Sequence, residues 1–450
     1  MKSKNLIILC TVFVLSGCSE VKTENPEIQP VSEITTVQEK TDINVAFLTN
    51  QMYSDFSIEE QAKKFRKSNG KYNLDVNVYM DDEDYYAESA FNRLSLDIIS
   101  GNIPDVIIAP PEKAHILQKN GYFTDIVPLM ESYDGIKQSD LLDNVLESVS
   151  ENGEIPLIYS SFTLETATAK TSIVGNITNW SFEEMSSAFA ELPQDDNHDF
   201  LYNLLDDGTF RRYVTLKMFS GCVDGNTCDF SKVVPYVMDF ISSAKTVGAR
   251  YKTLKLPENF DNMLYDNRAI VNFFEINGIN SSYTISAYMP FYGEEFTFVG
   301  MPSLNGSGAY TRVSYMYGIT ETSENKEGAW KFVSSLFETG SLTQKSLEHK
   351  GIPVTKTAVE NLCDMGSYMN NSIRAPYSYP GSDEKLEISD NTVNQLVEYI
   401  STVTLEPYAD LQIESIINEE CGAVYAGERT PEECADILNN RIGIYLSEKS

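Results

Sequence analysis

The stretch DVIIA at residues 105–109 predicts a buried strand, because its apolar residues run together and Pro110-Pro111 ends the run. Outward toward the N-terminus, LDVNVYM at residues 74–80 alternates strictly between apolar and polar side chains, as a strand does. Further outward, INVAFL at residues 43–48 is a short apolar run of β-prone residues. We therefore expect three strands in this part of the chain.

Helical patterns separate these strands. Residues 57–67 begin with Ser57, which can cap a helix, and Glu60 follows three residues later, as in a capping box. The apolar face of this helix is Ile58, Ala62 and Phe65. A second pattern covers residues 84–99, with an apolar face of Ala87, Phe91, Leu94 and Ile98. Alternating strands and helices predict an α/β fold with a parallel sheet.

Ligands of parallel α/β sheets bind beyond the carboxyl ends of the strands. The loops that follow the three predicted strands are residues 49–55, 81–84 and 110–112. We therefore expect binding residues in these loops.

The N-terminus has the features of a secretory signal. Lys2 and Lys4 precede an apolar run at residues 6–15, which is too short for a membrane-spanning helix of about 20 residues. The end of the run, Leu15-Ser16-Gly17-Cys18, resembles a bacterial lipobox. This resemblance implies a signal peptide at residues 1–17 and a lipidated Cys18 carrying palmitate-type acyl chains. The alternative is an ordinary signal peptide that happens to contain this cysteine.

Composition restricts the partners. Residues 18–41 are polar and without periodicity, as in a flexible tether. The chain has 34 Lys and Arg against 66 Asp and Glu, a net charge of −32. Such an acidic chain is a poor partner for nucleic acid or for an anionic membrane surface, so we expect membrane attachment only through the lipid anchor.

Five cysteines follow Cys18. Cys222 and Cys228 lie in GCVDGNTCDF, where Gly225 allows a tight turn, and they form our disulfide candidate. Cys421 and Cys434 are a second candidate pair, and Cys363 would then remain a free, small apolar residue.

Several motifs together resemble one family. ISGNIPDVIIAP at residues 99–110, followed by KNGYFTDIVPLM at 119–130, resembles the first-domain signature of extracellular solute-binding lipoproteins (family 1, carbohydrate type) of bacterial ABC importers. The further motifs, in chain order, are NGEIPLIYSSF (152–162), NWSFEEM (179–185), EGAWKFVSSLF (327–337), HKGIPVTKTA (349–358) and GERTPEECADILNNRIGIYL (427–446).

The resemblance implies a two-lobe fold like that of type II periplasmic binding proteins, with a hinge and an interlobe cleft. Lobe one would take residues 42–157 and 303–355, and lobe two residues 158–302 and 356–450. The implied function is capture of a sugar or oligosaccharide by a monomer on the outer face of the cell membrane, which delivers it to an ABC permease. Helical patterns at residues 181–191, 232–245, 391–401 and from 430 fit lobe two.

A sugar needs aromatic rings for its apolar face and carboxylates or amides for its hydroxyls. Position at the ends of the three predicted strands selects the candidate ligand-binding residues Asn50, Gln51, Tyr53, Asp81, Asp82, Pro110, Pro111 and Glu112. The resemblance adds Ser160, Ser161 and Phe162 at the implied first crossing, and Phe273, Phe274 and Glu275, where similar proteins place an aromatic residue. Tyr310 and Tyr379 are added as aromatic side chains alone. Simpler roles stay open for several of them. Strand alternation sends only one of Phe273 and Phe274 into a cleft, Asp81-Asp82 could form a turn, and Glu112 could cap a helix.

The sequence contains no GxxxxGK[ST], GxGxxG, GxSxG or HExxH motif, and its three histidines lie far apart. Residues 195–206 space oxygens roughly as a calcium loop does, but Phe200 stands where the turn needs glycine, so we interpret them as a solvated loop. We therefore expect neither enzyme activity nor a cofactor or metal. The alternatives are a protein of the same fold that binds a peptide or polyamine, and a surface enzyme or adhesin.

Overall fold

The computed structural model describes residues 40–50, 58–81, 87–191, 207–243, 271–278, 295–304, 308–347, 351–361 and 390–449. Residues 40–450 form one compact unit. The predicted signal peptide, Cys18 and almost all of the predicted tether lie outside the described residues. Among the helices that the structure describes, none combines the length and apolar character needed to cross a membrane.

The first sheet contains the three strands that the sequence predicts. β1 (Thr41–Asn50) pairs in parallel with β2 (Tyr72–Asp81) on one side and β3 (Val106–Ala109) on the other. A late strand, β10 (Met316–Ile319), adds antiparallel to β3 and gives the order β10-β3-β1-β2. The predicted α/β fold class is therefore confirmed.

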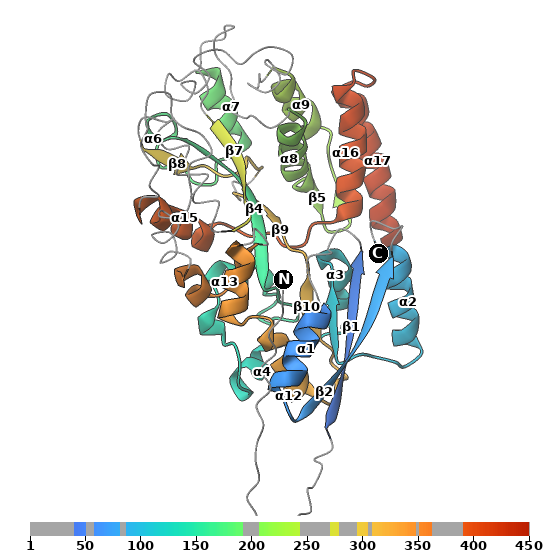
Figure 1. Ribbon diagram of the computed structural model, residues 1–450. Helices are drawn as coiled ribbons and strands as arrows, with labels where there is room; N and C mark the ends of the chain where they lie inside the picture. The colour runs from blue at the N-terminus through green and yellow to red at the C-terminus, as the bar shows by residue number, and fades with distance from the viewer. Residues whose placement is uncertain are drawn as a thin grey trace, which may run out of the picture. The chain divides into compact units, whose positions relative to one another are not determined.

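Helices cover both faces of this sheet (Figure 1). The chain moves from β1 to β2 through α1 (Ile58–Ser68) and back past β1 to β3 through α2 (Glu88–Ile99). Right-handed crossovers in opposite directions place these helices on opposite faces. α12 (Lys326–Ser335) joins α1, where the rings of Phe65 and Phe332 meet edge to face at 5.4 Å.

The details of two helix starts differ from the prediction. Ala87 has a φ of +53°, a left-handed conformation that a helix interior does not accept, so α2 begins at Glu88, and residues 84–86 of the predicted helix lie outside the described residues. Pro110-Pro111 ends β3 as predicted and also starts α3 (Pro111–Lys119), because proline is well suited to the first helical position. Shorter helices follow at α4 (Val127–Ser132), η2 (Gln138–Asp140) and α5 (Asp143–Val149).

The second sheet is built around β4 (Ser161–Lys170), which is long and largely buried. Its partners are all antiparallel to it: β7 (Val271–Ile276), β8 (Phe296–Phe298), β9 (Tyr310–Arg312) and β11 (Ile352–Pro353). A small hairpin of β5 (Val223–Asp224) and β6 (Thr227–Cys228) lies apart from this sheet.

Helices pack around the second sheet, and α16 and α17 run side by side (Figure 1). Capping boxes start α7 at Ser181 and Glu184 and α17 at Thr430 and Glu433, at the beginning of two of the predicted helical patterns. The remaining bounds are α6 (Thr171–Val174), α7 (Phe182–Ala190), α8 (Asp207–Ser220), α9 (Val233–Ser243), α13 (Thr339–Leu347), α15 (Asp390–Thr402), α16 (Leu411–Tyr425) and α17 (Pro431–Lys449).

Three segments cross between the two sheets. The first runs from Ile158, which bridges to Tyr317 in β10, into β4. The second runs directly from β9 to β10, and the third from β11 to Thr355, which bridges to Leu141. Since β9 belongs to the second sheet and β10 to the first, we propose that the second crossing lies near residues 313–315. The lobe boundaries given above stay a prediction.

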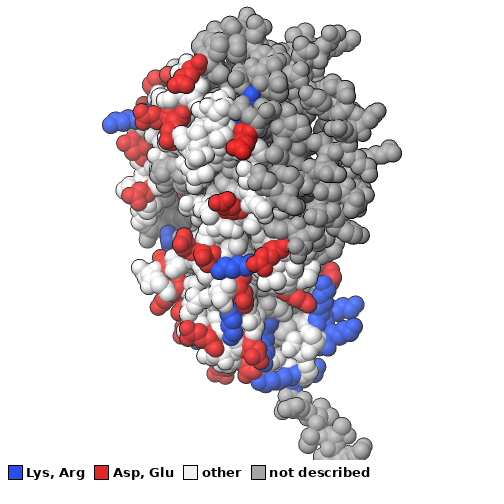
Figure 2. All heavy atoms as spheres, turned by 90° about the vertical axis from the view of Figure 1, so that its left-hand side faces the viewer, with Lys and Arg blue, Asp and Glu red and all other residues white. Residues whose placement is uncertain are grey.

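The buried apolar side chains form two hydrophobic cores. The first contains residues of both sheets, such as Ile107 of β3 and Leu164 of β4, and the second contains residues of the second sheet and its helices, such as Val271 of β7 and Val214 of α8. Trp330 is fully buried in the first core and Trp180 is 1% exposed in the second, so both tryptophans are structural. Figure 2 shows acidic side chains spread over the described part of one face, with Lys and Arg side chains between them and toward its lower end. The excess of acidic residues is thus a dispersed surface charge on this face.

Candidate functional site

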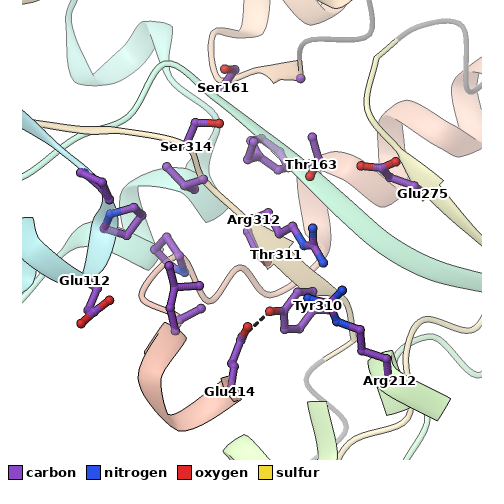
Figure 3. A pocket seen from close by; sticks show the side chains of 18 residues that line it. Glu112, Ser161, Thr163, Arg212, Glu275, Tyr310, Thr311, Arg312, Ser314 and Glu414 are labelled. Atoms are coloured by element: carbon purple, nitrogen blue, oxygen red, sulfur yellow. Dashed lines mark hydrogen bonds between the residues drawn. The ribbon is translucent and has the colours of Figure 1, made fainter. Parts of the chain in front are cut away.

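A cavity of about 260 Å³, which we call the main cavity, lies where the two sheets meet (Figure 3). It lies beyond the carboxyl end of β3, beside the starts of β4 and α16. Its lining residues are Pro110, Pro111, Glu112, Ser161, Phe162, Thr163, Arg212, Glu275, Tyr310, Thr311, Arg312, Val313, Ser314, Gly351, Pro407, Ala409, Leu411 and Glu414.

The first sheet contributes the start of α3 to this cavity. Pro110 and Pro111 present apolar rings there, and Glu112 in the first turn is only 8% exposed. The Lys113 Nζ lies 3.4 Å from the Glu112 Oε1, and the same ammonium also pairs with Glu88. A buried carboxylate is tolerated when a cation accompanies it, so Lys113 explains how Glu112 is kept at this wall.

The crossings contribute the opposite wall. Ser161, Phe162 and Thr163 begin β4, and Gly351 lies just before β11. Gly351 has a φ of +118°, and a Cβ at this position would lie 3.0 Å from the Cβ of Ser161. Glycine therefore allows the first and third crossings to approach each other beside the cavity.

Tyr310 and Glu414 form a buried pair in the wall of the cavity. The phenol of Tyr310 donates a hydrogen bond to the Glu414 Oε1, and these residues are 7% and 9% exposed. Burial raises the pKa of Tyr310 well above its usual value, and the nearby Glu414 charge adds to this effect. Burial also raises the pKa of Glu414, against the lowering effects of the Tyr310 hydrogen bond and the charges of Arg312 and Arg212.

Arginine side chains lie beside this pair. The Arg312 Cζ lies 5.4 Å from the centroid of the Tyr310 ring, within the range of a cation–π contact. Arg212 of α8 is exposed and lines the same cavity. Figure 3 shows both arginine side chains near Tyr310, and the hydrogen bond from Tyr310 to Glu414. The cavity thus combines two guanidinium groups with hydroxyls, carboxylates and apolar rings.

A second cavity of about 200 Å³ adjoins the first. Tyr310, Thr311, Ala409 and Glu414 line both cavities, so the Tyr310–Glu414 pair stands in a shared wall. Glu406, which pairs with the buried Lys217, lines the second cavity.

The structure places seven of the predicted site residues on the main cavity: Pro110, Pro111, Glu112, Ser161, Phe162, Glu275 and Tyr310. Ser160 lies beside it and hydrogen-bonds to Tyr317. Phe273 packs in the second core, and Phe274 is half-buried with its ring 6.3 Å from that of Phe298. Neither phenylalanine lines the cavity. Whether any of these residues contacts a ligand stays a prediction.

The remaining predicted residues lie at strand ends or beyond. Asn50 and Asp81 end β1 and β2 and are paired in register, but their side chains lie outside the described part of the chain. Gln51, Tyr53, Asp82 and Tyr379 also lie outside the described residues.

Sequence reasoning missed Arg212, Arg312 and Glu414. The sequence did give a reason to select Arg312, because it stands two residues after the predicted site residue Tyr310, and side chains at this spacing share a strand face. No feature of the sequence gives such a reason for Arg212 or Glu414, since each is a charged residue on a helix that is far in the sequence from the predicted loops.

The cysteines that the structure describes are free thiols. Cys222 is half-buried next to β5, and Cys228 in β6 pairs in register with Val223. The proposed bridges therefore stay predictions. The described residues contain no cluster of three or more His, Cys, Asp or Glu that could hold a metal ion, and residues 195–206 lie outside them.

No family model matches the chain, and no curated protein matches it either. Solved structures do match. An extracellular solute-binding protein family 1 from Alicyclobacillus acidocaldarius is 15% identical, with a TM-score of 0.53 over 90% of this chain and 98% of the other. The sugar-binding protein MalE from Xanthomonas citri is 12% identical, with a TM-score of 0.53 over 91% and 98%.

A periplasmic oligogalacturonide-binding protein from Yersinia enterocolitica is 15% identical, with a TM-score of 0.52 over 91% of this chain and 100% of the other. The chain therefore has the two-lobe α/β fold of these solute-binding proteins, as the sequence motifs imply.

Proposed function

We propose that this protein is a lipid-anchored extracellular solute-binding protein that captures a carbohydrate in the main cavity and delivers it to an ABC permease. The observation that carries the proposal is the position of the cavity. It lies where the two sheets meet, next to the three segments that cross between them. Proteins of similar fold include a sugar-binding protein and an oligogalacturonide-binding protein, which supports a saccharide as the solute.

The chemistry of the lining suits a saccharide. Sugar hydroxyls need both donors and acceptors, which Arg312 and the carboxylates of Glu112 and Glu275 supply. The apolar face of a sugar ring needs a hydrophobic surface, which Pro110, Pro111 and neighbouring side chains offer.

The mechanism that we propose is closure of the lobes around the solute. The three crossings act as the hinge, and solute contacts that form only in the closed state offset the free energy of closing. Closure brings surfaces of both lobes into the arrangement that the permease recognises. Transport itself is performed by the partner, and we expect the binding protein to act as a monomer without a cofactor.

A polyamine is less well matched to the cavity than a saccharide. A polyamine would place its ammonium groups beside Arg212 and Arg312, which repel them. A peptide remains compatible with the fold. Turnover of a glycan, or ligand binding without closure of the lobes, would instead indicate a surface enzyme or adhesin.

Isothermal titration calorimetry of the purified protein tests the proposal, with mono- and oligosaccharides, amino acids, peptides and polyamines as ligands. We expect micromolar or tighter binding to a saccharide. Glu275→Ala should weaken it, because Glu275 is exposed at the cavity and its loss leaves the fold intact. Glu432→Ala on the surface of α17 is the matched control. Binding only to peptides or polyamines would contradict the saccharide.

The anchor needs a separate test, because calorimetry does not report on it. Cells that express the protein with Cys18 should retain it in the membrane fraction and incorporate labelled palmitate. The Cys18→Ser variant should do neither. Equal membrane retention of both variants would overturn the lipid anchor and leave solute binding untouched.

A further inference from the structure

The main cavity holds two guanidinium groups, although the chain as a whole carries a net charge of −32. We propose that the solute is an acidic saccharide, and that Arg212 and Arg312 bind its carboxylate. This inference rests on the proposed function and makes the solute class more specific.

Arg312 is held in position by a chain of buried contacts. Glu414 accepts the hydrogen bond of the Tyr310 phenol, which orients the ring, and the Arg312 Cζ lies 5.4 Å from the ring centroid. A guanidinium over an aromatic ring loses little freedom on binding, because its planar fork is already oriented. Such a group is suited to a bidentate pair with a carboxylate.

Arg212 reaches the same place from a different element. It lies on α8, whereas Arg312 lies on β9, and both charges act on Tyr310 and Glu414. Figure 3 shows the two side chains beside the same tyrosine. Two guanidinium groups from separate elements that converge on one cavity wall can together pair with a carboxylate, a group that a neutral sugar does not carry.

Each acidic residue of the cavity has a polar or charged neighbour of its own. Glu112 has the Lys113 ammonium at 3.4 Å, on the wall formed by α3. Glu414 receives the hydrogen of Tyr310 in the shared wall of the two cavities. Glu275 is exposed on β7, and the Asn277 Nδ2 approaches its Oε2 at 3.4 Å. We place the carboxylate of the solute at the Tyr310 wall, next to the two arginines.

The test compares saccharides that differ only at one carboxylate. Calorimetry on the purified full chain uses galacturonate and galactose oligomers of equal length, and glucuronate and glucose oligomers likewise. We expect the acidic member of one pair to bind about 10- to 100-fold more tightly, the range for hydrogen bonds to a charged group. Arg312→Gln and Arg212→Gln should each reduce that preference.

Arg93→Gln is the matched control, because this arginine lies on α2 and donates to the Met80 carbonyl away from the cavity. If Arg312→Gln fails to fold, the exposed Arg212→Gln keeps the test intact. Equal or tighter binding of the neutral member in every pair would overturn the acidic solute and leave the proposed function standing. Failure to bind any saccharide would overturn both.

Discussion

The hydroxyl oxygen of Ser160 lies 2.8 Å from the phenolic oxygen of Tyr317, and both residues are at most 3% exposed. This hydrogen bond joins the first crossing segment to β10, next to the backbone bridge between Ile158 and Tyr317. Tyr317→Phe would leave the Ser160 hydroxyl buried without this partner. We expect a loss of about 1–3 kcal/mol in the free energy of unfolding, measured by urea denaturation.

Tyr236→Phe is the matched control. The Tyr236 side chain is 52% exposed, and its hydroxyl lies 3.1 Å from that of Ser186 at the surface. Its removal should change stability by less than about 0.5 kcal/mol. A double-mutant cycle of Tyr317→Phe with Ser160→Ala should show coupling, and strictly additive effects would contradict the structural role of this hydrogen bond.

Gly328 of α12 packs directly against Tyr72 of β2 and Ile43 of β1 in the first sheet. A Cβ at this position would lie 2.7 Å from the Cε1 of Tyr72 and 2.8 Å from the Cδ1 of Ile43. Gly328→Ala should therefore destabilise the protein by about 1–3 kcal/mol through overpacking, measured by urea denaturation. Gly443→Ala in α17 is the same substitution in open space, and we expect it to stabilise by about 0.5–1 kcal/mol. Equal effects of the two substitutions would contradict this packing.

Much of the fold was predictable because its signals are local. The alternation at residues 74–80 and the apolar run at 105–109 each encode a strand without reference to the rest of the chain. The start of α2 was not predictable in this way, since the positive φ of Ala87 is set by how the chain enters the helix. β9 and β11 are only three and two residues long, and they become strands by pairing with β4.

The candidate site was predictable where it follows the sheet rule. Pro110, Pro111 and Glu112 line the main cavity because they come directly after β3, the position that the rule selects. Arg212 and Glu414 line it because α8 and α16 pack against each other beside the second sheet. This is a tertiary contact between segments far apart in the sequence, and no spacing in the sequence encodes it.

The thiol of Cys222 is a poor nucleophile in this structure. Burial raises the pKa of Cys222 to about 12, and burial also raises the pKa of Cys228. We expect slow alkylation of the Cys222 peptide by iodoacetamide at neutral pH and fast alkylation in urea, measured by mass spectrometry. Fast alkylation of the folded protein would contradict the burial. Reaction of both Cys222 and Cys228 in urea only after reduction, with the two linked in the unreduced peptide, would establish the predicted bridge.

The stability of the protein should depend on pH through two glutamates whose pKa values shift in opposite directions on folding. Hydrogen bonds from Lys331 and Lys71 lower the pKa of Glu327 to about 2, so its contribution is present above the ordinary value of 4.5 and is lost as pH falls toward 2. Burial raises the pKa of Glu414, so the folded state holds this proton more tightly than the unfolded chain does. The Glu414 contribution is therefore present below pH 4.5 and is lost as pH rises through its folded pKa.

Urea denaturation of two variants across this pH range separates these contributions. The destabilisation caused by Glu327→Gln should be largest near neutral pH and should shrink as pH falls below 4.5, because protonation already removes the attraction in the parent protein. Glu414→Gln should instead gain stability relative to the parent as pH rises, since the amide never acquires a buried charge, while Tyr310 can still donate to its oxygen. A stability difference between Glu414→Gln and the parent protein that does not change with pH would show that the folded protein does not raise the pKa of Glu414. The buried carboxyl group would then no longer explain how Tyr310 and Arg312 are positioned.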